Sequence, residues 1–270
     1  MDENILKGGL NMDKEGIIFA DLHLDMWPRN NPEPEYRMRK QPMMLAQRIT
    51  EVMQEHKTNT LFNLGDTLNN YECMPQVLDV LACFYKKLID SNPNIKIYYI
   101  VGQHDIRIRD NSGIDNSYIH RFLETYPKNL FYMHDKSLLI NNTSIYMSNF
   151  SYSGIIYPPV YHNIFLSHIV LGYTKCNSSC YDLCVAGDIH DFYDSGKNHS
   201  VGTPYMHWGH QPNSGVLGVV TFDGPNSTFK RISSDSDTIH FLRFDKEEKE
   251  DKIKEQPKEI IKEDKELQKI

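Results

Sequence analysis

The sequence predicts an α/β sandwich in which two β-sheets face each other and helices lie outside them. From residue 16 to about 106, short apolar runs alternate with helical stretches, which is typical of parallel strands joined by helices. From 130 to 244 the pattern changes to shorter strands and turns, which predicts a second sheet. A hydrophobic content of 40% is enough for the core of such a sandwich.

The elements follow in order along the chain. In the first half the predicted strands are 17–20, 60–64 and 97–101, and the predicted helices are 44–56 and 74–89, where apolar residues recur at helical spacing. In the second half the predicted elements are a hairpin of 138–140 and 144–147 around Asn141-Asn142, strands 164–167 and 183–186, and a hairpin of 216–222 and 229–232.

We expect three parts in the chain: a polar extension over residues 1–15, one domain over 16–244, and a charged tail over 245–270. The tail alternates Lys with acidic residues, and Pro257 interrupts it. It is either a solvated, disordered segment or an amphipathic helix that binds a partner.

The composition limits the function classes. A net charge of −7 argues against strong DNA binding by the chain alone. No apolar run is long enough to cross a bilayer and the N-terminus does not resemble a signal peptide. The 5 cysteines suggest free thiols in a reducing compartment, so we expect a cytoplasmic protein that is not bound to a membrane. Cys176, Cys180 and Cys184 are spaced four apart, which fits buried thiols better than a metal cluster.

Polar residues follow five of the predicted strands directly. They are Asp21 and His23, Asp66, Gln103 and His104, His168, and Asp188 and His190. Ligands of α/β sheets bind at the carboxyl ends of the strands, and these side chains are donors that divalent ions prefer. The sequence therefore predicts a metal site.

The chemistry of two neighbouring ions suggests roles for these residues. One carboxylate must bridge the ions, and Asp66 suits that position. The other ligands of the first ion would be Asp21, His23 and His190. The other ligands of the second ion would be Gln103, His168 and Asp188. His104 follows a ligand and is free to protonate a leaving oxygen or to stabilise charge in the transition state.

The order of these motifs resembles that of the calcineurin-like metallophosphoesterases over residues 16–232. Residues 20–24, 187–191, 201–205 and 215–220 most resemble the SbcD-type DNA-repair nuclease subunits, including phage-encoded ones. The resemblance implies a four-layer αββα sandwich of two mixed sheets, two Mn²⁺ ions with Mg²⁺ as the alternative, and phosphodiester cleavage in DNA. It implies the same metal ligands, with His104 as the catalytic histidine.

Two positions depart from the family pattern. Gln103 stands where the family usually has Asn, and Asp188 stands where it usually has the first His of a pair. The added methylene re-aims the amide, and the carboxylate favours hard ions such as Mn²⁺ or Mg²⁺. We expect a weaker second site that fills only at raised Mn²⁺.

Basic residues near the motifs are candidates for DNA contact. Arg29, Arg37 and Arg39 lie in the loop 25–42, among aromatic residues and prolines. Arg107 and Arg109 follow the His104 motif. A solvated loop explains the first group equally well, and a strand with one wet face explains the second.

The leading hypothesis is a Mn²⁺-dependent DNA exonuclease or endonuclease of the SbcD type, acting in DNA repair, recombination or phage DNA metabolism. The resemblance implies an SbcC-like coiled-coil ATPase as partner, for which the tail is the expected docking segment, and also a homodimer. One alternative is a small-molecule phosphoesterase or phosphodiesterase on the same metal centre. Another is a non-catalytic scaffold that has lost its chemistry through Gln103 and Asp188.

Overall fold

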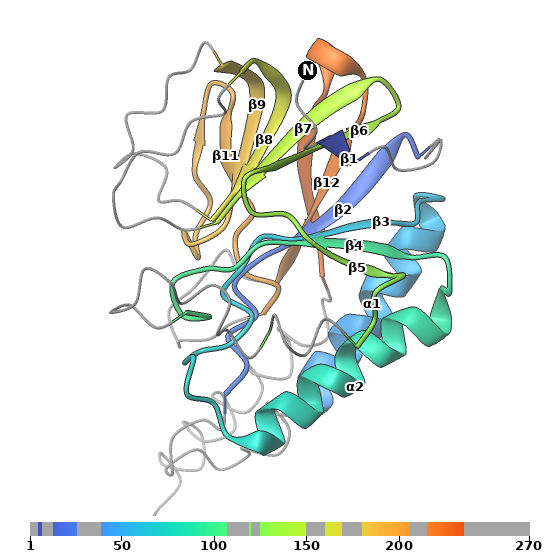
Figure 1. Cartoon of the computed structure of the whole chain (residues 1–270), viewed down its shortest axis with the longest axis vertical. Helices are drawn as coiled ribbons and strands as arrows, with labels where there is room; N and C mark the ends of the chain where they lie inside the picture. The colour runs from blue at the N-terminus through green and yellow to red at the C-terminus, as the bar shows by residue number, and fades with distance from the viewer. Residues whose placement is uncertain are drawn as a thin grey trace, which may run out of the picture. The chain divides into compact units, whose positions relative to one another are not determined.

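The computed structural model describes residues 5–6, 13–25, 39–106, 119, 125–149, 160–168, 180–205 and 215–234. These residues form two mixed β-sheets and two α-helices (Figure 1). The α/β sandwich that the sequence predicts is therefore confirmed.

The six-stranded sheet has the order β13-β12-β2-β3-β4-β5. Its strands are β2 (Glu15–Phe19), β3 (Thr60–Asn63), β4 (Lys96–Tyr99), β5 (Leu130–Tyr132), β12 (Val216–Thr221) and β13 (Phe229–Ser233). Strands β2 to β5 are parallel, whereas β12 pairs antiparallel with both β2 and β13. The carboxyl ends of β2, β3 and β4 therefore lie at one edge.

The seven-stranded sheet has the order β1-β6-β7-β8-β9-β11-β10. Its strands are β1 (Ile5–Leu6), β6 (Lys136–Ile140), β7 (Thr143–Ser148), β8 (His162–Ser167), β9 (Tyr181–Ala186), β10 (Asp194–Ser195) and β11 (Asn198–Ser200). Strands β7, β8 and β9 are parallel, and β6 and β7 form the predicted hairpin. Asn141 and Asn142 both have positive φ, as a tight turn of this hand requires.

Both helices have a proline in their first turn. Helix α1 (Gln41–Glu55) starts three residues before the predicted helix 44–56, and α2 (Pro75–Ser91) starts one residue after the predicted start at 74. Proline is favourable in the first turn because its missing N–H would have no partner there. The prolines therefore fix helix starts that apolar spacing alone leaves imprecise.

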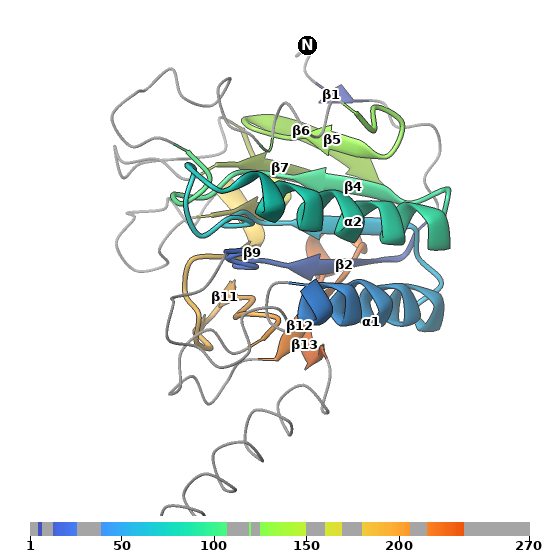
Figure 2. The same cartoon turned by 90° about the horizontal axis from the view of Figure 1, so that it is seen from below.

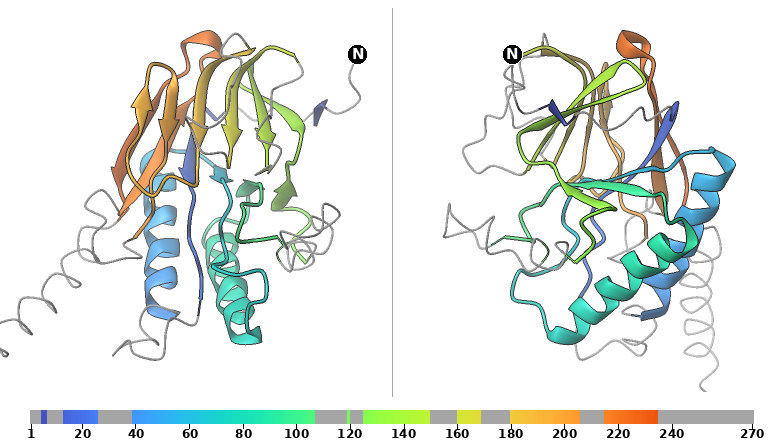
Figure 3. Two further views of the ribbon diagram at one scale, coloured as in Figure 1. Left: turned by 90° about the vertical axis from the view of Figure 1, so that its left-hand side faces the viewer. Right: turned by 45° about the vertical axis from the view of Figure 1, so that its right-hand side comes forward.

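The six-stranded sheet separates two apolar cores. Alternate residues Ile17 and Phe19 of β2 belong to the core shared with α1 and α2, whereas Ile18 packs in the core shared with β6 to β9. Alternation of this kind follows from the two-residue period of a strand. Figures 2 and 3 show α1 and α2 beside each other on the outer side of this sheet.

The fourth layer implied by the resemblance would cover the outer face of the seven-stranded sheet. Parallel strands need long crossover connections, and those around β8 contain residues 150–159 and 169–179. These connections lie outside the described residues, as does the tail 245–270.

Part of the segment expected as an N-terminal extension belongs to the sheets. Residues 5–6 form β1, which pairs with β6, and β2 begins at Glu15. The carboxylate of Asp13 accepts hydrogen bonds from Asn59 N (3.0 Å) and Thr60 Oγ1 (2.7 Å). These bonds tie the chain before β2 to the start of β3.

A substitution at Phe62 tests the assignment of the apolar core between the two sheets. Its ring is fully buried, lies 5.6 Å from the Tyr98 ring and 6.2 Å from the Phe222 ring, and has no polar atom. We predict that Phe62→Ala lowers the free energy of unfolding by about 3–5 kcal/mol, measured by urea titration. Leu139→Ala is the control, because Leu139 is 51% exposed and should change stability by less than about 0.5 kcal/mol. Equal losses would contradict this assignment of the core.

Candidate metal centre

The candidate residues follow strands of both sheets. The six-stranded sheet supplies residues after β2, β3 and β4, and the seven-stranded sheet supplies residues after β8 and β9. The polar groups thus meet where the carboxyl ends of strands from two sheets approach each other.

The loops after β2 and β3 run side by side. Asp21 N donates to Gly65 O (3.0 Å), and His23 N donates to Asp66 O (2.9 Å). A further bridge joins Leu24 to Leu68 in parallel register. The pairing of β2 with β3 therefore continues past the strand ends and fixes the spacing between Asp21, His23 and Asp66.

Four candidate residues have a left-handed backbone. The φ angles are 56° at Asp21, 43° at His23, 48° at Asp66 and 66° at Asp188. This conformation is uncommon for residues other than glycine and is unfavourable without compensating contacts. Strain of this kind concentrates at functional sites, where the surrounding structure holds the backbone in place.

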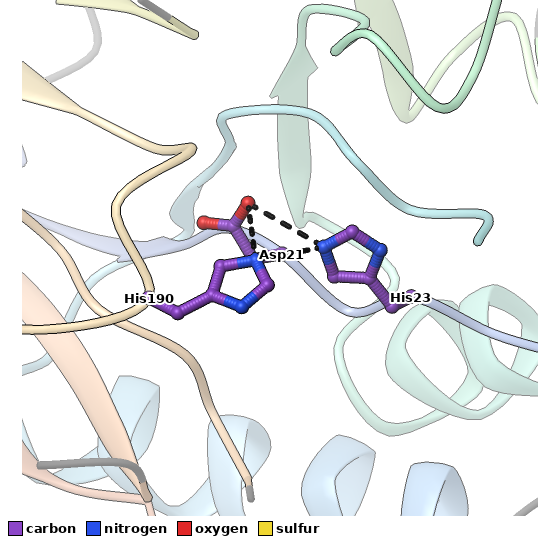
Figure 4. Close-up of side chains that lie close together, drawn as sticks. All are labelled: Asp21, His23 and His190. Atoms are coloured by element: carbon purple, nitrogen blue, oxygen red, sulfur yellow. Dashed lines mark hydrogen bonds and ion pairs between the residues drawn. The ribbon is translucent and has the colours of Figure 1, made fainter. Parts of the chain in front are cut away.

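Asp21, His23 and His190 form one cluster, and their side chains point toward one another (Figure 4). Asp21 Oδ1 lies 3.8 Å from His23 Nε2 and 3.6 Å from His190 Nε2, and the two Nε2 atoms lie 2.9 Å apart. Two ligands of one ion, each about 2.1 Å from it, lie roughly 3–4 Å apart. The three donor atoms therefore fit one divalent ion.

Asp66 lies among three imidazoles. Its Oδ2 is 3.3 Å from His168 Nε2, 3.7 Å from His23 Nε2 and 3.9 Å from His104 Nε2. Its Oδ1 accepts a hydrogen bond of 2.8 Å from His104 N. Asp66 belongs to two further groups that can hold a metal, one with His23 and His104 and one with Asp21 and His168. This position suits the bridging role that the sequence suggests.

The electrostatics of the centre favour a cation. Burial raises the pKa of Asp21 well above its usual range, and the Asp66 and Asp188 carboxylates raise it further against the opposing effect of His168. Burial likewise raises the pKa of Asp188. A buried carboxylate beside other carboxylates stays ionised only when positive charge lies close to it.

Asp66 and His168 form an ion pair in which each side chain shifts the pKa of the other. Burial acts to raise the pKa of Asp66, but the His168 and His23 imidazoles outweigh it and hold the pKa at about 2. Burial acts to lower the pKa of His168, but Asp66, Asp21 and Asp188 raise it to about 10. Asp66 is therefore an anion throughout the neutral range.

His168 is oriented by the main chain. Its Nδ1 lies 2.6 Å from Leu64 O, and because a carbonyl can only accept, Nδ1 carries a hydrogen. This leaves Nε2 to face Asp66. A histidine that binds a metal through one ring nitrogen usually donates a hydrogen bond from the other ring nitrogen to a carbonyl oxygen.

His104 is held in a similar way but reaches solvent. Its Nδ1 lies 2.8 Å from Asn69 O, and its side chain is 42% exposed. The Nε2 atom therefore faces the open side of the centre beside Asp66. An imidazole in this position can give a proton to the leaving oxygen of a bound substrate.

Gln103 and Asp188 lie in contact, and the contact is a hydrogen bond between their own side chains. Gln103 Nε2 donates a hydrogen bond of 2.8 Å to Asp188 Oδ1. Asp188 N lies 3.2 Å and 3.1 Å from the two carboxylate oxygens of Asp21. Among the described acidic, His and Cys side chains, the three groups that can hold a metal do not include Asp188. Of the expected second ligand set, these groups contain Asp66 and His168, whereas Gln103 and Asp188 contact each other.

The basic candidates are mostly outside the described residues. These are Arg29, Arg37, Arg107 and Arg109. Arg39 is described, is exposed and lies just before α1. Cys176 is also outside, whereas Cys184 is buried, Cys180 is half-buried, and neither belongs to a candidate metal group of the described residues.

Three supporting residues had no role in the sequence prediction. Asp105 is fully buried and accepts hydrogen bonds from Leu68 N and Gly102 N, both 2.9 Å, which joins the loops after β3 and β4. Asn69 supplies the carbonyl that orients His104. Tyr205 donates from its hydroxyl to Leu22 O (2.5 Å), between Asp21 and His23. These contacts link distant segments, so local sequence patterns do not predict them. Asp105 is the one residue of the three with a local signal, because it directly follows His104.

Comparison with models of known families and with curated proteins gives no match. Among solved structures, a 5'-nucleotidase of Candida albicans matches with 11% identity and a TM-score of 0.44, over 87% of this chain and 54% of its own. A Staphylococcus aureus protein described as a 5'-nucleotidase matches with 13% identity and a TM-score of 0.44, over 87% and 58%. GAP50, the anchor in the inner membrane complex of Plasmodium, matches with 10% identity and a TM-score of 0.46, over 82% and 85%. The chain thus spans little more than half the length of the two nucleotidases.

No helix within the described part of the chain is both long enough and apolar enough to cross a membrane.

Gly102 tests the close packing of the centre. A Cβ at this residue would lie 2.1 Å from Asp66 Oδ1 and 2.6 Å from His168 Nε2. We predict that Gly102→Ala weakens Mn²⁺ binding about ten- to a hundredfold in calorimetry, because the carboxylate must move. Gly196→Ala is the control, since its φ is +60° but a Cβ there meets nothing within 4 Å. It should cost about 1 kcal/mol of stability and leave Mn²⁺ binding unchanged. Equal effects on binding would contradict the prediction.

Proposed function

We propose that this chain is a metal-dependent phosphoesterase that hydrolyses phosphodiester bonds in DNA with Mn²⁺ as its preferred ion. The observation that supports it best is the placement of Asp66. This buried carboxylate lies within 3.9 Å of three imidazole nitrogens, next to a second cluster of Asp21, His23 and His190.

The residues present fit divalent ions. Asp21, His23, Asp66 and His190 would hold the first ion, and Asp66 and His168 would contribute to the second. When bound, such ions lower the pKa of water and neutralise charge that develops on a phosphoryl group. Mn²⁺ accepts both imidazole and carboxylate ligands, which suits this mixed set.

The protein's own part is to orient these groups and to move a proton. The main-chain carbonyls of Leu64 and Asn69 fix His168 and His104, so that each Nε2 faces the centre. His104 is the exposed member and is proposed to protonate the leaving oxygen. The DNA substrate is supported by the resemblance of residues 187–191 and 201–205 to SbcD-type subunits. An SbcC-like ATPase partner and a homodimer remain proposals on the same basis.

The substrate is tested with four compounds in Mn²⁺, Mg²⁺ or chelator. These are end-labelled linear duplex DNA, circular single-stranded DNA, bis-p-nitrophenyl phosphate and AMP. We predict Mn²⁺-dependent loss of DNA that chelator and Asp66→Ala both abolish. Asp90→Ala is the matched control, because this carboxylate is 62% exposed on α2 and should keep full activity. Hydrolysis of the small esters with intact DNA would favour the small-molecule alternative, and no cleavage in any metal would favour the scaffold.

The role of His104 is tested separately. We predict that His104→Ala lowers kcat about 10²–10⁴-fold, because the leaving oxygen loses its proton donor, while Mn²⁺ binding is kept. Cleavage rates of end-labelled linear duplex DNA, whose alkoxide leaving group needs the proton, and calorimetry with Mn²⁺ measure the two effects. His199→Ala, which removes an imidazole paired with Asp194 instead, should change neither. Loss of Mn²⁺ binding in His104→Ala would contradict the proton-donor role and indicate a metal ligand.

A further inference from the structure

The two residues that depart from the family pattern contact each other. Gln103 follows β4 in the six-stranded sheet, and Asp188 follows β9 in the seven-stranded sheet. The hydrogen bond of 2.8 Å from Gln103 Nε2 to Asp188 Oδ1 therefore connects the two sheets at the edge where the centre lies.

The bond changes what each side chain can offer an ion. Gln103 directs its amide nitrogen, which cannot ligate, toward Asp188, so its oxygen faces a different direction. Asp188 uses one carboxylate oxygen to accept this bond. A ligating group must aim a lone pair at the ion, and the amide takes one lone pair of Asp188 Oδ1 and fixes the direction in which the carboxylate points.

The main chain of Asp188 is nevertheless held at the centre. Its N–H points to the carboxylate of Asp21, and its φ of 66° is left-handed. A side-chain rotation, without movement of the backbone, would therefore be enough to release the carboxylate from Gln103. The bond therefore acts on a side chain whose main-chain N–H already lies within hydrogen-bond distance of Asp21.

We propose that Gln103 and Asp188 form a latch that withholds the Asp188 carboxylate from a second divalent ion. The inference rests on the proposed function only in that the centre must bind divalent ions. The protein then binds one ion tightly, at Asp21, His23, Asp66 and His190, and a second ion binds only when the latch opens. The weaker second site thus has a cause that one substitution can remove.

The test measures ion binding by the full-length chain, independently of activity. Mn²⁺ titration by calorimetry gives the two dissociation constants, and elemental analysis of the dialysed protein gives the number of tightly bound ions. We expect one tight ion in the wild type. Gln103→Ala should tighten binding of the second ion about tenfold, because a hydrogen bond to a charged group no longer competes. Gln103→Leu keeps the side-chain volume and should give the same gain.

Weaker binding of the second ion in these variants would overturn the proposal. If Gln103 were itself a ligand, both substitutions would weaken the second ion. An unchanged second ion, or two equal tight ions in the wild type, would also contradict the latch while leaving the proposed function standing. A wild type that binds no ion would instead contradict the proposed function itself.

Two further variants separate the latch from general effects. Gln47→Ala removes a matched amide-to-carboxylate bond, from Gln47 Nε2 to Glu51 Oε1 (3.1 Å), on the exposed face of α1. It should leave both dissociation constants unchanged. Gln103→Ala combined with Asp188→Asn should lose the gain of Gln103→Ala, because the released carboxylate is absent. Persistence of the gain in the double variant would overturn the proposal.

Discussion

Two carboxylates, Asp21 and Asp66, are almost completely buried next to each other, and the end of the molecule around them depends on compensating their charge. A buried anion without partners is strongly unfavourable. Compensation comes from imidazoles on four loops and from main-chain N–H groups, such as His104 N to Asp66 and Asp188 N to Asp21. Only residues that lie after strands of both sheets can supply all of these groups at once.

The same constraint explains the small residues around the centre. Gly65, Gly102 and Gly187 each bring backbone so close that a Cβ would lie less than 3.0 Å from a neighbouring atom. At Gly187 that neighbour is His168 Nδ1, at 2.7 Å. Close approach of backbone places N–H groups and imidazoles directly around the carboxylates. The apolar cores on both sides of the six-stranded sheet hold these loops in conformations that would be unfavourable in isolation.

Much of this arrangement could be predicted because it depends on local patterns. Short apolar runs identify β2, β3 and β4, and the polar residues that follow each run must meet at one edge of a parallel sheet. The Asn141-Asn142 turn was predictable for the same reason, since two residues at positive φ determine the hairpin. Apolar spacing does not give the exact starts of α1 at Gln41 and of α2 at Pro75, because it locates a helix without identifying its first turn, where Pro42 and Pro75 lie.

The remaining features depend on how distant segments are placed. Gln103 and Asp188 are 85 residues apart in the chain, and each alone resembles an altered metal ligand. Only the packing of one sheet on the other brings the amide to the carboxylate. The contact of Tyr205 with Leu22, 183 residues away, is of the same kind. No periodicity or motif in the sequence encodes such distances, so the sequence predicts which polar residues follow the strands but not the contacts between them.

Gln103 and His104 are consecutive residues, yet different parts of the molecule hold their side chains. Gln103 is bonded to Asp188 of the seven-stranded sheet, whereas His104 is bonded through Nδ1 to Asn69 of the loop after β3. Asn69 is in turn attached to the loop after β2, since its N donates to Leu24 O and its side chain donates to Asp25. The proposed proton donor, His104, is thus held by loops that follow strands of the six-stranded sheet. A change at the Gln103–Asp188 contact can therefore alter ion binding while His104 keeps its position beside Asp66, which separates the control of the metal centre from the transfer of the proton.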